Sequence, residues 1–341
     1  MQPPQSISIS TTTFIKAVLI GLGLWFLWFI RDIVAIFVGS LLLASLIEPF
    51  AAWFALRRIP RGIAVLIIYT LLLSFTSIFI VLFVPVVGQQ GAQLFAHFSD
   101  YYTQATQSLG QVRQFSEDYG LSTNLSTSLT ALQTSFNDTF GSVFSTVKGV
   151  VGGVVAVFIV LVLTFYMVVE EEKMRKYFRN LAPIEYQPYV VHLIKKLQKK
   201  MGEWLRGQLI LGLIVGGSVY LGLLFLGVNY ALLLALMAGV LEVVPYVGPI
   251  ISLIPALIIG FAQSPVIGFA VVILYLIVQQ LENHLLVPKV MQKVTGLNPI
   301  ISILALLVGI KAGGIVGAVF SIPLAMMGVV ILEDLFRDVT E

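Results

Sequence analysis

The stretch YALLLALMAGVLEVVPYVGPIISLIPALIIGFA, residues 230–262, decides the fold of this chain. Glu242 is its only charged residue, and the run exceeds the roughly 20 residues that cross a bilayer core. Pro245, Gly248, Pro249 and Pro255 interrupt it. Each half forms about 18 Å of helix, too short to span alone. Because freed backbone groups cannot face lipid, we predict a broken membrane helix buried in protein or lining a polar cavity.

Other apolar runs of spanning length lie on both sides of this stretch. They cover residues 14–30, 33–56, 63–87, 149–169, 208–227 and 266–283. A further run, 299–332, is interrupted after Lys311 by Ala312-Gly313-Gly314 and later by Pro323. The sequence therefore predicts an all-α, polytopic membrane protein with six full spans and two broken segments, which makes eight membrane segments.

Composition supports a membrane protein and excludes several functions. Hydrophobic residues make up 58% of the chain and charged residues 11%, against about 25% charged in soluble domains. A net charge of +3 is too weak to indicate nucleic-acid binding. The absence of cysteine excludes disulfides and thiolate chemistry, and the three histidines form no HExxH motif. We expect no cofactor, no resident metal and no enzymatic activity.

The distribution of lysine and arginine predicts the orientation. Arg57, Arg58 and Arg61 join the second and third runs, so this loop is expected in the cytoplasm, as is the N-terminus. Residues 88–148 are then outside, and the dense basic stretch 170–206 returns inside. Both termini are predicted to be cytoplasmic. The first run lacks a cleavage pattern and is expected to remain as a helix rather than act as a signal peptide.

These assignments divide the chain into four regions. Residues 1–87 form an N-terminal three-helix membrane region, and 88–148 an extracytoplasmic helical hairpin whose break falls at Asp118-Tyr119-Gly120. Residues 149–207 hold the fourth span and a basic amphipathic helix at the membrane surface, and 208–341 form the transport core. The apolar stripes of the hairpin indicate a connector with its own packing or a contact between subunits.

The candidate site follows the two breaks and the polar motif between them. A carboxylate at membrane depth is costly, so Glu242 is expected to be functional; alternatives are a place near the interface or a pairing with Lys311. If 230–262 and 299–332 are re-entrant hairpins from opposite sides, Glu242 and Lys311 approach each other. The polar motif indicates a transport-path lining or an ordinary helix end. The candidate residues are Glu242, Pro245, Gly248, Pro249, Gln279, Gln280, Glu282, Asn283, His284, Asn298, Pro299 and Lys311.

Three motifs resemble the AI-2E family of bacterial permease-like proteins. They are EVVPYVGPIISLIPA at 242–256, QQLENHLLVPKVMQKVTGLNPIISILALLVG at 279–309, and LLLASLIEPF at 41–50. The resemblance covers nearly the whole chain. It implies a transport protein of the bacterial cytoplasmic (inner) membrane that forms a homo-oligomer, with a pentamer as the expected size. In this family some members resemble exporters of the quorum-sensing signal autoinducer-2, and others are assigned cation–proton antiport.

The leading hypothesis is a secondary transporter that exports a small polar metabolite such as autoinducer-2. No nucleotide-binding motif is present, so an ion gradient is the expected driving force, coupled through Glu242. The alternative is a Na⁺(Li⁺)/H⁺ antiporter with Glu242, Glu282 and Asn283 as ligands. A non-transporting membrane scaffold is a third hypothesis. The expected partners are the lipid bilayer and a small polar solute, or a cation and protons.

Overall fold

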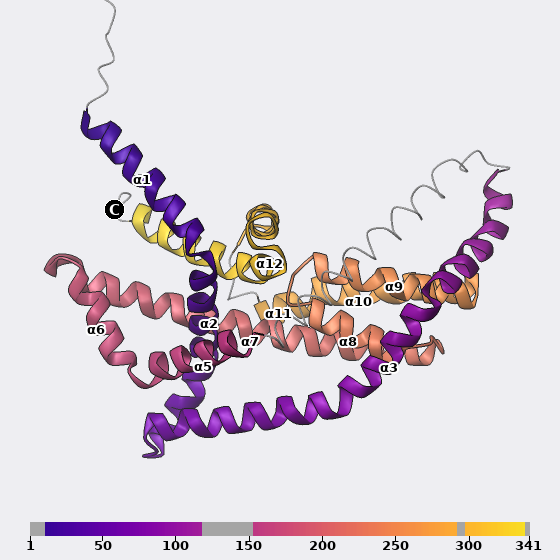
Figure 1. Ribbon diagram of the computed structural model, residues 1–341, viewed down its shortest axis with the longest axis horizontal. Coiled ribbons are helices and arrows are strands. Elements are labelled where there is room, and N and C mark those ends of the chain that lie inside the picture. The colour runs from indigo at the N-terminus through magenta and orange to yellow at the C-terminus, as the bar shows by residue number, and fades with distance from the viewer. Residues whose placement is uncertain (1–10, 118–152, 292–296, 338–341) are drawn as a thin grey trace, which may run out of the picture.

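The chain folds into long packed α-helices (Figure 1), in a computed structural model that describes residues 11–117, 153–291 and 297–337. These residues contain no strand, which confirms the predicted all-α class. Within these described ranges, five segments are long and apolar enough to cross a membrane. They are Arg31–Leu56, Arg61–Gln90, Ile184–Phe225, Pro265–Lys289 and Pro299–Asp334. The predicted total of eight membrane segments remains a prediction.

The N-terminal region consists of α1 (Thr11–Phe29), α2 (Arg31–Leu56) and α3 (Arg61–Glu117). Helix α3 continues through the boundary predicted at residue 87, so the third span and the first arm of the expected hairpin form one helix. The second arm and the break at 118–120 lie outside the described residues. Helix α3 packs along α9. In the C-terminal half of α3, the hydroxyl group of Tyr101 lies 3.2 Å from that of Tyr230, the residue before α8.

The middle of the chain contains α5 (Val154–Val169), α6 (Glu171–Leu181), a 3₁₀ turn at Ile184–Tyr186, and α7 (Gln187–Phe225). Helix α7 has 39 residues and includes both the predicted surface helix and the span predicted at 208–227. The region limit predicted at residue 207 thus falls inside this helix. Met201 and Trp204 of α7 are buried against α2, where Gly202 passes close to the carbonyl of Ser45.

The C-terminal region begins with α8 (Ala231–Leu241) and α9 (Val247–Gln263), which confirm the interruption predicted in 230–262. Helix α10 (Pro265–Leu281) starts at the N-cap Ser264, whose hydroxyl accepts a hydrogen bond from the Ile267 amide at 3.2 Å. A π-helical turn, Glu282–Leu286, and α11 (Val287–Met291) follow. Helix α12 (Pro299–Arg337) is kinked at Gly313 and Gly314.

Glycine allows α7 and α8 to approach closely. A Cβ added to Gly212 of α7 would lie 2.6 Å from the carbonyl oxygen of Gly239 in α8. A Cβ on Gly239 would lie 2.8 Å from the carbonyl oxygen of Gly212, and one on Gly216 would lie 3.2 Å from Gly239 Cα. Lipid tails are as apolar as hydrophobic side chains, so membrane helices gain little from the hydrophobic effect when they associate. They associate instead through close packing of this kind.

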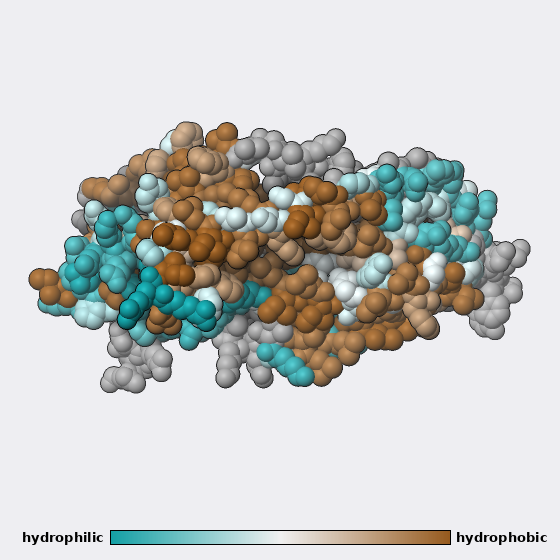
Figure 2. Space-filling model, turned by 90° about the horizontal axis from the view of Figure 1, so that it is seen from below, coloured by the Kyte–Doolittle hydropathy of each residue, from teal (hydrophilic) through white to brown (hydrophobic). Residues whose placement is uncertain are grey.

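The surface agrees with a membrane location. Figure 2 shows hydrophobic residues over the middle of the molecule and hydrophilic residues gathered toward the two ends of its long axis. On α3 the exposed side chains include many large apolar ones, among them Leu71, Phe75, Ile78 and Val81. In water such a surface would be an aggregation site, whereas lipid solvates it.

Candidate functional site

The break between α8 and α9 is a tight reversal of the chain. Helix α8 ends at Leu241, α9 begins at Val247, and the two helices pack against each other as neighbouring arms (Figure 1). Tyr246 has a φ of 66°, a left-handed value that strains a non-glycine residue. Gly248 lies against the carbonyl of Leu241, where no Cβ fits. The reversal thus explains why the sequence places Gly248 between Pro245 and Pro249.

The freed backbone groups of this turn are satisfied inside the protein. The amide of Val247 donates to the carbonyl of Pro245 at 2.8 Å, and that of Gly248 to Val244 at 2.9 Å. The side-chain amide of Gln208, on α7, donates to the carbonyl of Glu242. Gln208 is itself buried. This arrangement meets the requirement that broken backbone within a membrane be buried in protein.

Glu242 is almost fully enclosed at this reversal. Its exposed fraction is 1%, and its Oε2 atom has no hydrogen-bond partner among the described residues. Its Cβ would lie 3.8 Å from a Cβ added to Gly212, so the carboxyl group sits directly above the glycine contact between α7 and α8. A carboxylate at such a place is expensive unless it is paired or protonated.

The partner of Glu242 is a second carboxyl group, that of Glu282. The two carboxyl groups interact electrostatically, and Glu282 has an exposed fraction of 7%. Gln279 adds a donor, with its Nε2 atom 3.2 Å from Glu282 Oε2. The ion pairs within the described residues include neither carboxyl group. Two negative charges in contact repel strongly, so a proton held between them is the natural state of such a pair.

A π-helical turn places Glu282 at this point. The amide of Val287 donates to the carbonyl of Glu282, five residues earlier, rather than four. The next residue, Pro288, has no amide hydrogen to give to His284 and its ring crowds that carbonyl, so the turn before it widens. Single π turns are frequent at functional sites because they reorient one side chain within a helix.

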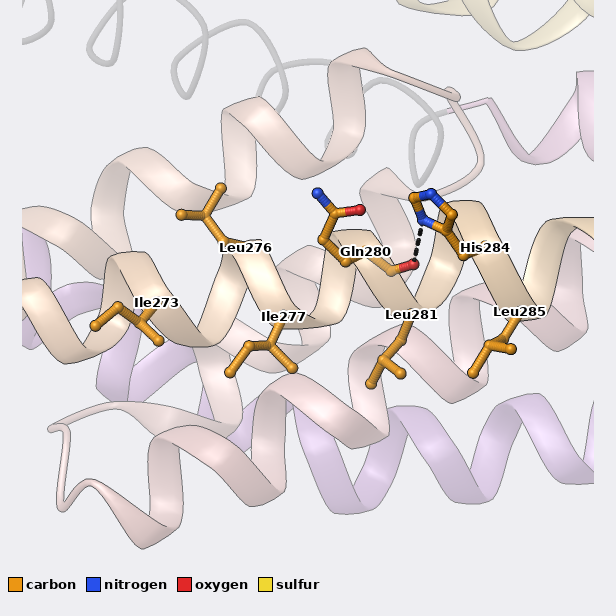
Figure 3. Close-up of a pocket in the computed structure, with 7 residues that line it drawn as sticks. All are labelled: Ile273, Leu276, Ile277, Gln280, Leu281, His284 and Leu285. Atoms are coloured by element: carbon orange, nitrogen blue, oxygen red, sulfur yellow. Dashed lines mark hydrogen bonds between the residues drawn. The ribbon is translucent and has the colours of Figure 1, made fainter.

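The polar motif predicted as one lining divides between two faces of this helix. Glu282 points into the protein, whereas Gln280, Asn283 and His284 are exposed. Gln280 and His284 border a hollow of about 530 Å³ on the outer face of α10, together with Ile273, Leu276, Ile277, Leu281 and Leu285 (Figure 3). His284 Nδ1 lies 3.1 Å from the carbonyl oxygen of Gln280. The structure thus brings Glu282 to Glu242, with Gln279 bound to Glu282, and leaves Gln280, Asn283 and His284 exposed.

The break in 299–332, which lies within α12, has a different environment from the break between α8 and α9. The two arms of α12 cross where Gly309 and Gly317 lie against each other's carbonyl groups. Lys311 is exposed, and no ion pair joins it to Glu242 in the part of the chain that the structure describes. Gly313 and Gly314 instead border a cavity of about 770 Å³ between α12 and the start of α2.

Asn298 and Pro299 form a helix start. Asn298 Oδ1 accepts a hydrogen bond from the Ile300 amide at 2.9 Å, as an N-cap does, and Pro299 occupies the first position of α12. Both are exposed. Their position is therefore explained by helix capping.

Three buried polar residues of α7, α9 and α10 were not predicted from the sequence. Gln208 holds the carbonyl of Glu242, as described. Ser252 donates to the carbonyl of Pro249 at 3.0 Å, and the hydroxyl of Tyr275 lies 3.3 Å from the carbonyl of Ser252. The sequence did indicate that Tyr275 faces the same way as Glu282, because the spacing of Tyr275, Val278 and Glu282 places them on one face of a helix.

Comparison with known proteins was consistent with these features. The sequence matches the family described as AI-2E family transporter over residues 14–337. "Putative transport protein YueF" of Bacillus subtilis is 30% identical over 275 residues, 78% of this chain and 74% of that protein. "Putative transport protein YrrI" of the same organism is 28% identical over 92% of this chain and 88% of its own. "Putative permease PerM" of Escherichia coli is 27% identical over 50% of each chain.

Proposed function

This chain belongs to the AI-2E transporter family and is a multi-pass membrane protein, and we propose that it exports a small polar metabolite driven by an ion gradient. Autoinducer-2 is the first substrate to test, because the family is named for its export. The single observation that carries the proposal is the buried carboxyl pair, Glu242 and Glu282, at a discontinuous helix. Discontinuous helices at which polar groups meet are common binding sites in secondary transporters.

The pair provides a way to couple a proton to a conformational change. Holding one proton, the two carboxyl groups share a hydrogen bond and carry a single negative charge. Loss of that proton leaves two adjacent negative charges, which repel and favour separation of α8 from α10. Because Glu242 lies on the short turn between α8 and α9, separation moves a hinge rather than the middle of a continuous helix. Uptake and release of a proton therefore bias two arrangements of this hairpin.

The same groups support a second candidate, Na⁺(Li⁺)/H⁺ antiport. When both carboxyl groups are deprotonated, they offer hard oxygen ligands of the type that small cations prefer. Glu242 Oε2 is buried and has no partner in the described residues, so it is available to a cation. Asn283, the third residue of that hypothesis, is exposed, and its Oδ1 accepts a hydrogen bond from Gln279 Nε2 at 3.5 Å.

One reconstitution experiment separates the two candidates. Purified protein is reconstituted in vesicles with an imposed pH gradient. The gradient is expected to drive the transport of labelled autoinducer-2 across the vesicle membrane, and this transport is expected to dissipate the pH gradient. Proton movement that requires Na⁺ or Li⁺ and is indifferent to the metabolite would favour the antiporter. A gradient that drives neither solute would contradict both proposals.

We also propose that 230–262 and 299–332 are re-entrant hairpins in a homo-oligomer of the bacterial inner membrane. Packing of α8 on α9, and the crossing of Gly309 with Gly317, support the hairpins. In the hairpin topology Lys289 lies in the cytoplasm, where lysine is favoured, and both termini are also cytoplasmic. In a topology of eight simple spans, Lys289 lies outside the cell.

Labelling of a single cysteine tests this topology. The chain has no cysteine, and Lys289 is exposed, so Lys289→Cys gives one accessible thiol. Protection from a membrane-impermeant maleimide in intact cells, followed by labelling after permeabilisation, is the expected result. A cysteine at Lys173, on the basic α6, serves as the cytoplasmic reference. Immediate labelling of Lys289→Cys from outside would rule out the hairpin topology.

A further inference from the structure

A second group of charged residues lies where α2, α3, α6 and α7 meet. Arg61 Nη1 is 2.7 Å from Glu171 Oε2, and Arg61 Nη2 is 3.6 Å from Glu48 Oε1. Arg175 also binds Glu171. Burial alone would raise the pKa of Glu171, but its hydrogen bonds with Arg61 and Glu48 and the charge of Arg175 hold that pKa below its ordinary value. Arg61 and Arg175 thus bind the carboxyl groups of Glu48 and Glu171.

The cavity next to this group carries additional positive charge. It has a volume of about 240 Å³. Its charged lining residues are the four cations Arg175, Lys195, Lys199 and Arg206 and the two acidic residues of the group above, Glu48 and Glu171. Arg206 donates to the carbonyl of Ser45 at 3.3 Å, and the ion pairs within the described residues do not include Lys195, Lys199 or Arg206. Arg175 Nε is buried without an acceptor among those residues. The cavity therefore has an excess of donors and positive charge over acceptors.

An apolar cavity adjoins the basic one. It has a volume of about 230 Å³ and shares Met167, Glu171, Arg175 and Gln198 with its neighbour. The remaining lining is almost entirely hydrophobic and comes from α2, α6, α7 and α12. These residues are Phe37, Leu41, Met174, Phe178, Ile194, Leu197 and Met327. A basic space and an apolar space thus lie on two sides of Arg175.

Helix α6 indicates that the paired cavities lie at the level of lipid headgroups. Besides Glu172 and Asn180, its exposed residues are basic or large and hydrophobic, a composition that suits a helix lying in a membrane interface. The basic ones are Lys173, Lys176 and Arg179, and the hydrophobic ones, with the following turn, are Tyr177, Leu181 and Ile184. Arg175, on the same helix, is directed instead into both cavities.

We propose that the paired cavities bind an anionic phospholipid, with its phosphate among Arg175, Lys195, Lys199 and Arg206 and the first part of one acyl chain in the apolar cavity. The phosphate supplies the acceptors that the basic cavity lacks, with charge-assisted hydrogen bonds to arginine and lysine. A basic pocket between membrane helices on the cytoplasmic side is a known type of lipid headgroup site. A free phosphate would leave the adjoining apolar cavity unused.

The test is the thermal stability of the purified full-length protein in mixed micelles. Dioleoylphosphatidylglycerol is expected to raise the unfolding midpoint by about 5 °C over an equal amount of dioleoylphosphatidylcholine, because a ligand that binds only the folded state stabilises it. The double variant Lys195→Gln/Lys199→Gln is expected to lose most of this difference. Inorganic phosphate alone is expected to give no shift.

A matched variant separates the site from general surface charge. Lys173→Gln/Lys176→Gln removes the same charge from exposed positions on α6 that border neither cavity. It is expected to respond to phosphatidylglycerol like the unaltered protein. An equal loss of response in both double variants, no difference between the two lipids, or stabilisation by phosphate equal to that by phosphatidylglycerol would each overturn the proposal.

Discussion

Replacing Glu242 by glutamine is expected to reduce gradient-driven transport to about a tenth or less while the protein still folds and inserts. Glutamine keeps the shape of the side chain, and its amide hydrogen can donate to the carboxylate of Glu282. The contact between α8 and α10 therefore survives, but it no longer depends on a shared proton. Flux in reconstituted vesicles, measured across a range of pH, is the test.

Glu282→Gln is expected to act in the same way, because the pair shares one proton. The double variant Glu242→Gln/Glu282→Gln should lose no more than either single one, as is usual for groups that act as a unit. Any residual flux in these variants is expected to vary less with pH than that of the unaltered protein. Glu333→Gln is the matched control, since it makes the same change at an exposed position of α12. Undiminished, pH-dependent flux in Glu242→Gln would remove this carboxyl group from the coupling mechanism.

Local features of the fold could be predicted from the sequence. The helical apolar segments and the interruption near Glu242 follow from hydropathy and from proline and glycine, which act within a few residues of themselves. The region limits at residues 87 and 207, drawn from a change in composition, do not coincide with the ends of helices. Helices α3 and α7 run through residues 87 and 207, because a change from apolar to polar side chains does not by itself end a helix.

Contacts between distant segments were only partly predictable. The antiporter hypothesis grouped Glu242 with Glu282, and the structure brings these two together. It also grouped Asn283, which is exposed, and treated Gln280 and His284 as part of the same lining. A helix turns by about 100° per residue, so consecutive polar residues cannot share one face. Applying that period to 275–284 would have separated Glu282 from its neighbours.

Two features required the structure. Arg61 was interpreted as a signal of topology, but it also binds Glu171, 110 residues away, and no local pattern predicts that partner. Gly212 and Gly216 form a small-xxx-small pair, a pattern that does indicate close helix packing in membranes. The sequence analysis did not use this pattern, and the pattern does not name Gly239 as the partner.

The contact between α7 and α8 leads to the second large expected effect. Gly212→Ala places a methyl group 2.6 Å from the carbonyl oxygen of Gly239, closer than folded proteins tolerate. Backbone atoms cannot rotate away as a side chain would, so α8 must shift. Overpacking of this kind costs about 1–3 kcal/mol, and Gly212→Leu is expected to cost more. A lower unfolding midpoint in detergent is the expected measurement.

The same shift is expected to impair transport. Because a Cβ on Gly212 also lies 3.8 Å from Glu242 Cβ, displacement of α8 moves Glu242 relative to Glu282 on α10. Flux should therefore fall in Gly212→Ala even at temperatures where the protein remains folded. Gly217→Ala is the matched control, since it is the same substitution on the same helix with no atom within 4 Å of the new Cβ. At position 217 alanine favours a helix more than glycine does, so this variant is expected to be more stable by about 0.5–1 kcal/mol. If both alanine variants behaved alike in midpoint and flux, the glycine contact would have no part in positioning Glu242.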